Sequence, residues 1–267
     1  MSEIPEPATN REGVTKRLQR KRTRSVTTAA ILLGWEVTGR LLGLSPAVLP
    51  VPSRIAWQIW QEGPRLLDHG IETFYVILGG YSLALAFGTP CGVLLAWLAA
   101  TRHSGARVLA LTARVPLVTF APLFLIWFGF GPRPKILFTF LLCFSPLAVG
   151  AALGLRSVTP EILALVRLMG AGPAGLFFKV QLPSSLPGFF AGLKSASTLA
   201  VVGATVAEFV EADTGLGYLM LAGVSRMDVP SLCAALVVLN GIGMTLYGVL
   251  SLLERIVIPW NVEPGEV

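Results

Sequence analysis

Long apolar runs separated by short polar or proline-rich segments dominate the chain. The runs with few or no charged residues lie at 26–44, 73–101, 108–128, 136–155, 188–209 and 230–253. A hydrocarbon core about 30 Å thick needs about 20 apolar residues for one helical crossing. The pattern therefore predicts an all-α, polytopic membrane protein with about six transmembrane helices.

The segments around the apolar runs carry local signals. Ser53 follows a proline-rich stretch that no helix tolerates, and it is expected to cap a short amphipathic helix over 54–61. Glu36 and Arg40 lie four residues apart within the first run, where such a pair can neutralise itself. The glycine- and proline-rich segment 129–134 predicts a turn between the third and fourth crossings.

Composition excludes a large soluble catalytic domain. Apolar residues make up 54% of the 267 residues and charged residues 13%, whereas soluble domains have about 45–50% and about 25%. Residues 1–25 are strongly basic and directly precede an apolar run. The positive-inside rule explains this tail better than nucleic-acid binding does. We expect a basic cytoplasmic tail at 1–25, a transmembrane domain at 26–257 and a C-terminal tail at 258–267, with both termini in the cytoplasm.

The segment 156–187 departs from the apolar pattern. It contains four charged residues and four prolines, so it is too polar to cross a membrane, yet it is too apolar for a free linker. The spacing predicts two short helices on the membrane surface, with a hinge near Gly172 and Pro173. Leu182 and Pro183 are expected to end the second of these helices, because proline cannot continue it. A loop with this much apolar surface is expected to dock into a partner.

No catalytic, cofactor or metal site is expected. The sequence contains neither a GxxxxGK[ST] phosphate loop nor an HExxH pair, and Gly215 to Gly217 are too few residues for a phosphate loop. Lys194 lies near the start of the fifth run. Its amine either attracts an anion in a translocation path or extends to the inner interface, and its position favours the second interpretation.

Several motifs in the segment 156–187 and beyond resemble one family. The stretches 168–171 (LMGA) and 178–183 (FKVQLP) are similar to the cytoplasmic "EAA" loop of binding-protein-dependent ABC importer permeases. Gly170, Val180, Leu182 and Pro183 fit that pattern. Further stretches that look like nitrate/sulfonate/taurine-type permeases lie at 49–53, 126–129, 207–209 and 215–219.

The resemblance implies a type I importer permease fold in a bacterial inner membrane. It implies that 156–187 is a coupling loop, whose short helix sits in a cleft of a separate ATPase. The residues expected to form this contact are Ala164, Leu165, Arg167, Leu168, Gly170, Ala171, Phe177, Leu182 and Pro183. The family's acidic residue is replaced here by Ala164, with Glu161 about one turn earlier, so apolar docking by Leu165, Leu168 and Phe177 is expected to carry more of the interface.

The resemblance also implies partners and a path. Two ATPase copies, an extracytoplasmic substrate-binding protein and a permease homodimer are expected, because one chain supplies one coupling loop and a pair of ATPases needs two. The path is expected along the dimer axis, mostly between the third to fifth crossings. Residues considered for the path or its outer mouth are Lys194, Glu208, Gly215 and Gly217.

The cargo and the transport class have alternatives. A nitrate-, sulfonate- or taurine-like anion is the default cargo, but the stretches 192–194, 198–204 and 208–210 look more like permeases for thiamine-pyrimidine or riboflavin precursors. A stand-alone secondary carrier or channel is the alternative function, and it would need no ATPase. A membrane-embedded enzyme has little support, because no catalytic constellation is visible.

Overall fold

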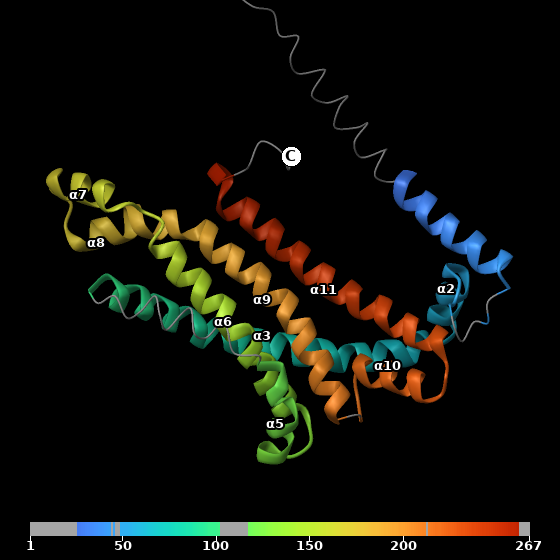
Figure 1. Ribbon diagram of the computed structural model, residues 1–267. Helices are drawn as coiled ribbons and strands as arrows, with labels where there is room; N and C mark the ends of the chain where they lie inside the picture. The colour runs from blue at the N-terminus through green and yellow to red at the C-terminus, as the bar shows by residue number, and fades with distance from the viewer. Residues whose placement is uncertain (1–25, 44, 46–48, 102–116, 212, 262–267) are drawn as a thin grey trace, which may run out of the picture.

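The described part of the protein is helical and contains no strand. The computed structural model describes residues 26–43, 45, 49–101, 117–211 and 213–261. Its helices are a first helix at 26–41, α2 (Pro52–Gln61), α3 (Gly63–Thr101), η1 (Leu117–Phe120), α5 (Ala121–Phe128), α6 (Pro132–Leu155), α7 (Pro160–Leu168), α8 (Pro173–Leu176), η2 (Phe177–Gln181), α9 (Leu182–Glu211), α10 (Leu216–Ser225), α11 (Val229–Val257) and η3 (Pro259–Asn261). The all-α class is therefore confirmed (Figure 1).

Four segments are long and apolar enough to cross a membrane. They are Gly63–Leu98, Pro132–Leu155, Pro173–Glu211 and Val229–Val257, and they correspond to the second, fourth, fifth and sixth predicted crossings. The first predicted crossing contains the helix at 26–41. Part of the third, 108–128, lies outside the described residues, as do the tails 1–25 and 262–267, so the count of six stays a prediction.

Close backbone contact joins α6 to α9 in the centre of the helix assembly. A methyl group on Gly150 would lie 2.7 Å from the Cα atom of Gly192, and one on Gly188 would lie 2.8 Å from the Cα atom of Gly154. Each helix thus presents two glycines four residues apart to the other. Small residues at this spacing allow helices to pack backbone to backbone in a membrane.

A buried apolar cluster ties α3 and α11 to this pair. Ile77 and Tyr81 of α3, Leu147 of α6, Ala200 of α9 and Leu250 of α11 all belong to it. The Tyr81 hydroxyl donates a hydrogen bond to the carbonyl oxygen of Leu193 at 3.2 Å, so α3 is also held to α9 by a buried polar contact. In Figure 1 the axes of α6, α9 and α11 are roughly parallel, with α7 at one end of these helices and α10 at the other.

Several predicted boundaries were wrong. The second crossing was expected to begin at 73, but α3 begins at Gly63. Ser53 does not cap α2, because Val51 occupies the cap position and Pro52 the first turn. The Ser53 hydroxyl instead donates to Glu36 Oε1 at 2.7 Å, and the same carboxylate oxygen accepts a 2.7 Å hydrogen bond from Arg40 Nε, as the sequence spacing predicts for that pair.

The turn predicted at 129–134 is shorter than expected. Gly131 occupies the cap position of α6, and the helix begins at Pro132. Prolines fit in the first turn of a helix because the N–H groups there have no intrahelical partner. Pro134 therefore lies within the helix start and does not prevent it.

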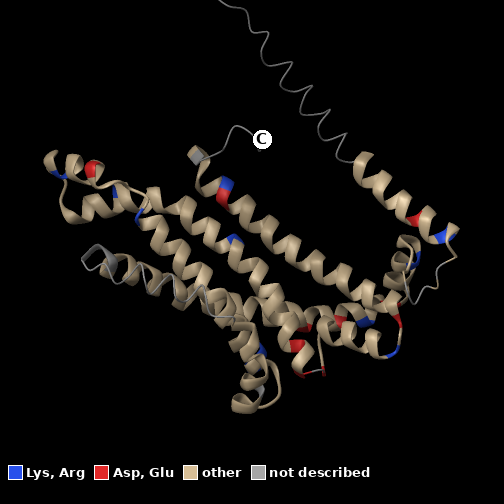
Figure 2. Cartoon of the chain, viewed as in Figure 1, with Lys and Arg blue, Asp and Glu red and all other residues tan. Residues whose placement is uncertain are grey.

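Charged side chains of the described residues lie mainly near helix ends. Figure 2 shows long uncharged stretches in the middle of α6 and α11, with acidic and basic residues gathered near α10 and near α7. Two groups of polar residues consequently lie at opposite ends of the long helices. These two ends contain most of the residues that the sequence singles out.

Candidate functional site

The first candidate site is α7 with the turn that ends it. Thr159 stands at its N-terminal cap, Glu161 lies in its first turn and Arg167 in its last turn, which matches the helix dipole at both ends. The amide of Gly170 bonds to the carbonyl oxygen of Arg167 at 3.0 Å, and the amide of Ala171 bonds to that of Val166 at 3.3 Å. This pair of bonds is a Schellman motif.

Gly170 is required by this motif for a conformational reason. Its φ angle is +86°, in the left-handed region that glycine adopts without the Cβ clash of other residues. No atom lies within 4 Å of the position a Cβ would take. The glycine of the family pattern is therefore explained by the left-handed turn that ends α7, and not by close packing against another part of this chain.

The exposed side of α7 is apolar. Leu165 is 58% exposed, Leu168 86% and Met169 79%. Ala164 is also exposed, so the acidic residue that the family pattern would have there is replaced by more apolar surface. Contiguous exposed apolar residues of this kind are typical of surfaces that contact a partner protein or lipid.

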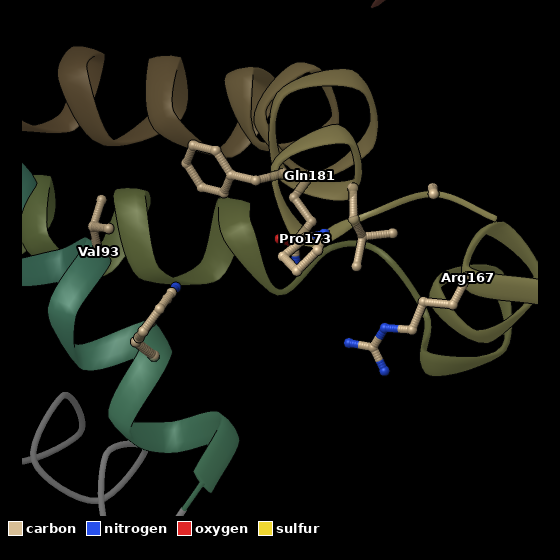
Figure 3. Close-up of a pocket in the computed structure, with 8 residues that line it drawn as sticks. Val93, Arg167, Pro173 and Gln181 are labelled. Atoms are coloured by element: carbon tan, nitrogen blue, oxygen red, sulfur yellow. The ribbon is translucent and has the colours of Figure 1, made fainter.

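A cavity of about 610 Å³ separates this turn from the end of α3. Figure 3 shows the side chain of Arg167 extending from α7 beside the cavity, with Val93 of α3 on the other side. Ala171 and Phe177 also line it. Ala171 and Phe177 thus face the body of the protein and not the exposed side of α7, although the sequence analysis grouped them with Leu165 and Leu168 as expected ATPase contacts.

The predicted second surface helix is instead the start of the long α9 helix. We expected Leu182 and Pro183 to end a surface helix, but helical structure continues from α8 through η2 into α9. The π-helical turn η2 explains the continuity. Its last hydrogen bond runs from the Leu182 amide to the Phe177 carbonyl, five residues back. This wider turn directly precedes Pro183, which lacks an amide hydrogen for the usual ladder.

The second candidate site is the start of α10, at the opposite end of the helices. Side chains from α3 and α9 accept hydrogen bonds from the amides of the cap residue and of the first two residues of α10. The Gly215 amide donates to His69 Nδ1 at 3.1 Å, the Leu216 amide to Thr73 Oγ1 at 2.8 Å, and the Gly217 amide to Glu208 Oε2 at 2.7 Å. Tertiary contacts therefore cap this helix, since its own cap residue is a glycine without a side chain.

Glycine is needed at both 215 and 217 because Glu208 lies against them. A Cβ on Gly215 would overlap the Glu208 carboxyl group, and one on Gly217 would lie 2.8 Å from the Glu208 Cβ. Gly215 also has a φ angle of +102°. The structure thus brings together Glu208, Gly215 and Gly217, three of the four residues predicted for the translocation path or its outer mouth.

A buried ion-pair network adjoins this site. Lys135 Nζ lies 3.0 Å from Glu211 Oε2 and 2.9 Å from Asp213 Oδ1. The side chain of Lys135 is 4% exposed and that of Glu211 is fully buried. The Gly131 amide, at the cap of α6, also donates to Glu211. We call His69, Thr73, Lys135, Glu208, Glu211 and Asp213 the polar cluster.

Electrostatics hold Asp213 in its charged form. Partial burial would raise the pKa of its carboxyl group, but the hydrogen bond and positive charge of Lys135 outweigh this effect, and the pKa lies below its ordinary value. The ion pair therefore joins α6 to the turn between α9 and α10 across the neutral pH range.

Lys194, the fourth predicted residue, lies away from the polar cluster. Its amine forms an ion pair with Glu254 of α11 and lies 5.7 Å from the centre of the Tyr247 ring. Its side chain is 20% exposed. A contact between α9 and α11 is thus a role for Lys194 that sequence reasoning did not consider.

Sequence comparisons decide the family. The family of binding-protein-dependent transport system inner membrane components matches residues 88–260. The chain belongs to this family of importer permeases. The match covers the segment 156–187 and α10, whereas His69 and Thr73 of the second candidate site lie before it.

Curated relatives and a solved structure agree with this assignment. A formylaminopyrimidine transport permease from Halalkalibacterium halodurans is 31% identical over 86% of this chain and 92% of its own. A riboflavin transport permease from Chloroflexus aurantiacus is 34% identical, over 88% and 89%, and a taurine transport permease from Escherichia coli is 29% identical, over 94% and 93%. The inward-facing MetNI methionine ABC transporter matches with a TM-score of 0.58 and 19% identity, over 72% of this chain and 95% of that one.

The protein is therefore the membrane-spanning, non-enzymatic permease subunit of an ABC importer. ATP hydrolysis takes place on a separate subunit, and a substrate-binding protein is a further partner of this family. These three relatives are named as transport permeases, and none of them is named as a stand-alone carrier, which was the alternative function in the sequence analysis.

Sequence reasoning missed His69, Thr73, Lys135 and Glu211. One available signal was the placement of charge. Arg133 and Lys135 directly precede the apolar run 136–155, while Glu211 and Asp213 directly follow the run 188–209. Because these two segments cross in opposite directions, such ends lie on the same side of a membrane, and opposite charges there can pair.

Proposed function

We propose that two copies of this chain form a homodimer, and that α7 of each copy docks into one of two ATPase subunits. The exposed Leu165, Leu168 and Met169 on a helix capped by Gly170 support this proposal. A short helix attached to two long helices can transmit ATPase closure as a rigid-body movement. Leu182 and Pro183 lie where η2 passes into α9, so they would carry this movement into the membrane.

We propose further that α7 lies on the cytoplasmic side and α10 on the outer side of the inner membrane. Figure 1 supports this orientation, since the residue-26 end of the first helix and the residue-257 end of α11 both lie on the α7 side. Both termini would then be cytoplasmic, in agreement with the basic tail 1–25. The substrate-binding protein would deliver its cargo at the α10 end.

The cargo is proposed to be a small solute of one of two classes. The formylaminopyrimidine and riboflavin transport permeases support a pyrimidine or vitamin precursor. The taurine transport permease supports a small sulfonate-like anion. All three relatives match nearly the full chain, so overall similarity alone does not separate these classes.

The single observation that carries the docking proposal is the 86% exposure of Leu168 at the end of α7. Replacing it with aspartate places a charge where an apolar contact is expected, so Leu168→Asp should remove most of the ATPase that co-purifies with the protein. Val224→Asp is the matched control, since Val224 is 55% exposed on α10 at the opposite end. Equal ATPase recovery with both variants would contradict the docking proposal.

A further inference from the structure

Two adjoining cavities lie between α7 and the end of α3. The first is the cavity of about 610 Å³ beside Arg167 (Figure 3), and the second has a volume of about 530 Å³ and is lined by Arg156. Trp97, Phe177 and Gln181 line both cavities, so the two share a wall. The proposed function uses neither arginine.

The walls of these cavities are mostly apolar. Aliphatic side chains from α3, α6, α7 and α8 line them, namely Val93, Ala96, Leu155, Leu163 and Leu176. Each volume lies within the range of about 300–1,000 Å³ that is usual for small-molecule pockets. The cavities can therefore accommodate a flexible hydrocarbon chain.

The cavities lie where three membrane-crossing segments have an end. Trp97 stands next to the last residue of the crossing segment of α3, and Arg156 directly follows that of α6. Phe177 lies near the start of the segment that contains α9. The Trp97 side chain is 72% exposed, and tryptophan is enriched at the ends of membrane helices, where lipid meets water. The cavities are thus placed at the level of the lipid headgroups.

The charge at the cavities is positive. One arginine lines each cavity, none of the described lining residues is acidic, and Glu161 of α7 lines neither cavity. Within the described part of the chain, neither the Arg156 nor the Arg167 guanidinium group forms an ion pair. A guanidinium group presents paired N–H donors that match a phosphate group. Unpaired arginines beside apolar walls therefore fit an amphipathic anion, because a small soluble anion would leave the walls without a contact.

We infer that these cavities bind an anionic phospholipid of the membrane, with its phosphate group held through Arg156 and Arg167 and an acyl chain between Trp97 and Phe177. This inference rests on the proposed function, because it takes the α7 end as the cytoplasmic side. The cytoplasmic leaflet contains anionic lipids, and basic pockets between membrane helices on that side bind their headgroups. The lipid would connect α7, which receives the ATPase, to the ends of α3 and α6.

The test measures lipid adducts on the purified permease–ATPase complex by native mass spectrometry. The probes are dioleoyl phosphatidylglycerol, which is anionic, and dioleoyl phosphatidylcholine, which has the same acyl chains and no net charge. We expect the wild type to bind phosphatidylglycerol at least about fivefold more tightly than phosphatidylcholine. Arg156→Gln and Arg167→Gln should each weaken the binding of phosphatidylglycerol about fivefold, which is the contribution of one basic side chain to contact with anionic lipid. The binding of phosphatidylcholine should change less than about twofold in both variants.

Arg255→Gln is the matched control. Arg255 is exposed in the last turn of α11, at the same end as α7, and it lines neither cavity. The variant loses the same charge, and its binding of phosphatidylglycerol should stay within about twofold of the wild type. Arg167→Lys should bind more tightly than Arg167→Gln, because it keeps the charge. Glycerol 3-phosphate should not displace the lipid at equal concentration, because it lacks the acyl chains.

Four results would overturn the inference. They are equal binding of the two lipids by the wild type, unchanged binding of phosphatidylglycerol in both Arg156→Gln and Arg167→Gln, an equal loss in Arg255→Gln, and displacement of the lipid by glycerol 3-phosphate at equal concentration. Loss of the ATPase from Arg167→Gln with unchanged lipid binding would assign this arginine to the ATPase contact instead. A complex that keeps its ATPase and shows no preference for phosphatidylglycerol refutes the inference alone. A chain that purifies without any ATPase and still prefers phosphatidylglycerol refutes the proposed function alone.

Discussion

Substitutions at Gly170 test whether α7 needs a left-handed residue at its end. Gly170 has a φ angle of +86° and open space around its Cβ position. Any loss of coupled transport on substitution of Gly170 must therefore come from the backbone conformation and not from a steric clash. Gly172 is the matched control, because it also has open space around its Cβ position, but its φ angle is −70°.

The expected magnitude follows from this geometry. The left-handed conformation costs an ordinary L-residue roughly 1–2 kcal/mol, which shifts the population of the correct turn by a factor of about 5–30. Asparagine tolerates this region better than alanine does, although it is larger. Coupled transport should therefore decrease in the order wild type, Gly170→Asn, Gly170→Ala, while Gly172→Ala should stay within about twofold of the wild type.

The assay is ATP-driven uptake into proteoliposomes that contain the complete importer, together with the ATP hydrolysed per molecule imported. A misformed turn should lower uptake more than ATP hydrolysis, because the ATPase would no longer drive the helices. Higher uptake with Gly170→Ala than with Gly170→Asn would refute the reasoning, since that order follows side-chain size. Equal losses at 170 and 172 would refute it as well.

Three further changes test the packing of the described helices. Gly192→Val should lower stability by about 1–3 kcal/mol in thermal unfolding, because a Cβ there would lie 2.8 Å from a backbone oxygen of α6; an unchanged melting temperature would contradict the close approach. Lys194→Gln should destabilise by about 1–3 kcal/mol, because it leaves the charge of Glu254 without its partner, and the charge-swapped pair Lys194→Glu with Glu254→Lys should recover most of the loss. Asp213→Asn should lower the melting temperature at neutral pH. The difference in melting temperature between variant and wild type should close as the pH falls below the ordinary Asp pKa of 3.8, because the lowered pKa of Asp213 stabilises the fold only while the group is ionised. A difference that persists in acid would contradict the role of the pairing between Asp213 and Lys135.

Hydrophobic patterning predicted the elements better than their ends. The charge-free stretch 136–155 lies within α6, and 230–253 lies within α11, since burial in lipid requires continuous apolar helix. The ends depend on contacts that no local pattern contains. Helix α3 extends ten residues before the predicted start at 73, and its added turns carry His69, whose ring accepts the Gly215 amide from a segment 146 residues away.

Proline was the main source of wrong boundaries. The sequence rule that proline ends a helix failed at Pro183 and at Pro132 for different reasons. At Pro132 the missing amide hydrogen lies in a first turn, where it has no partner to lose. At Pro183 a π-helical turn shifts the preceding hydrogen bonds. Such a turn is stabilised by the surrounding packing, so residue preferences alone did not reveal it.

The candidate sites were predictable where a motif names the residues, and not where pairing spans the chain. Gly170 was found from the family pattern, but its role in a Schellman motif needed the backbone geometry. Glu208 and Gly217 were found separately, and only the fold shows that the carboxylate accepts the amide of the glycine. Lys135 and Glu211 are 76 positions apart in the sequence, and no local signal pairs them.

The two sites are connected by one continuous helical segment. Residues 173–211 run without a break from the turn after α7 to the polar cluster, and they contain both Phe177 and Glu208. A helix braced by the glycine contacts with α6 behaves as a rigid element over this length, because interiors so closely packed deform little. A movement of α7 driven by the ATPase would then reach Glu208 as a displacement of the whole helix. Glu208 holds the start of α10 through the hydrogen bond from the Gly217 amide. We therefore expect ATP-dependent closure to displace α10, and Gly192→Val to weaken this displacement by loosening the helix pair.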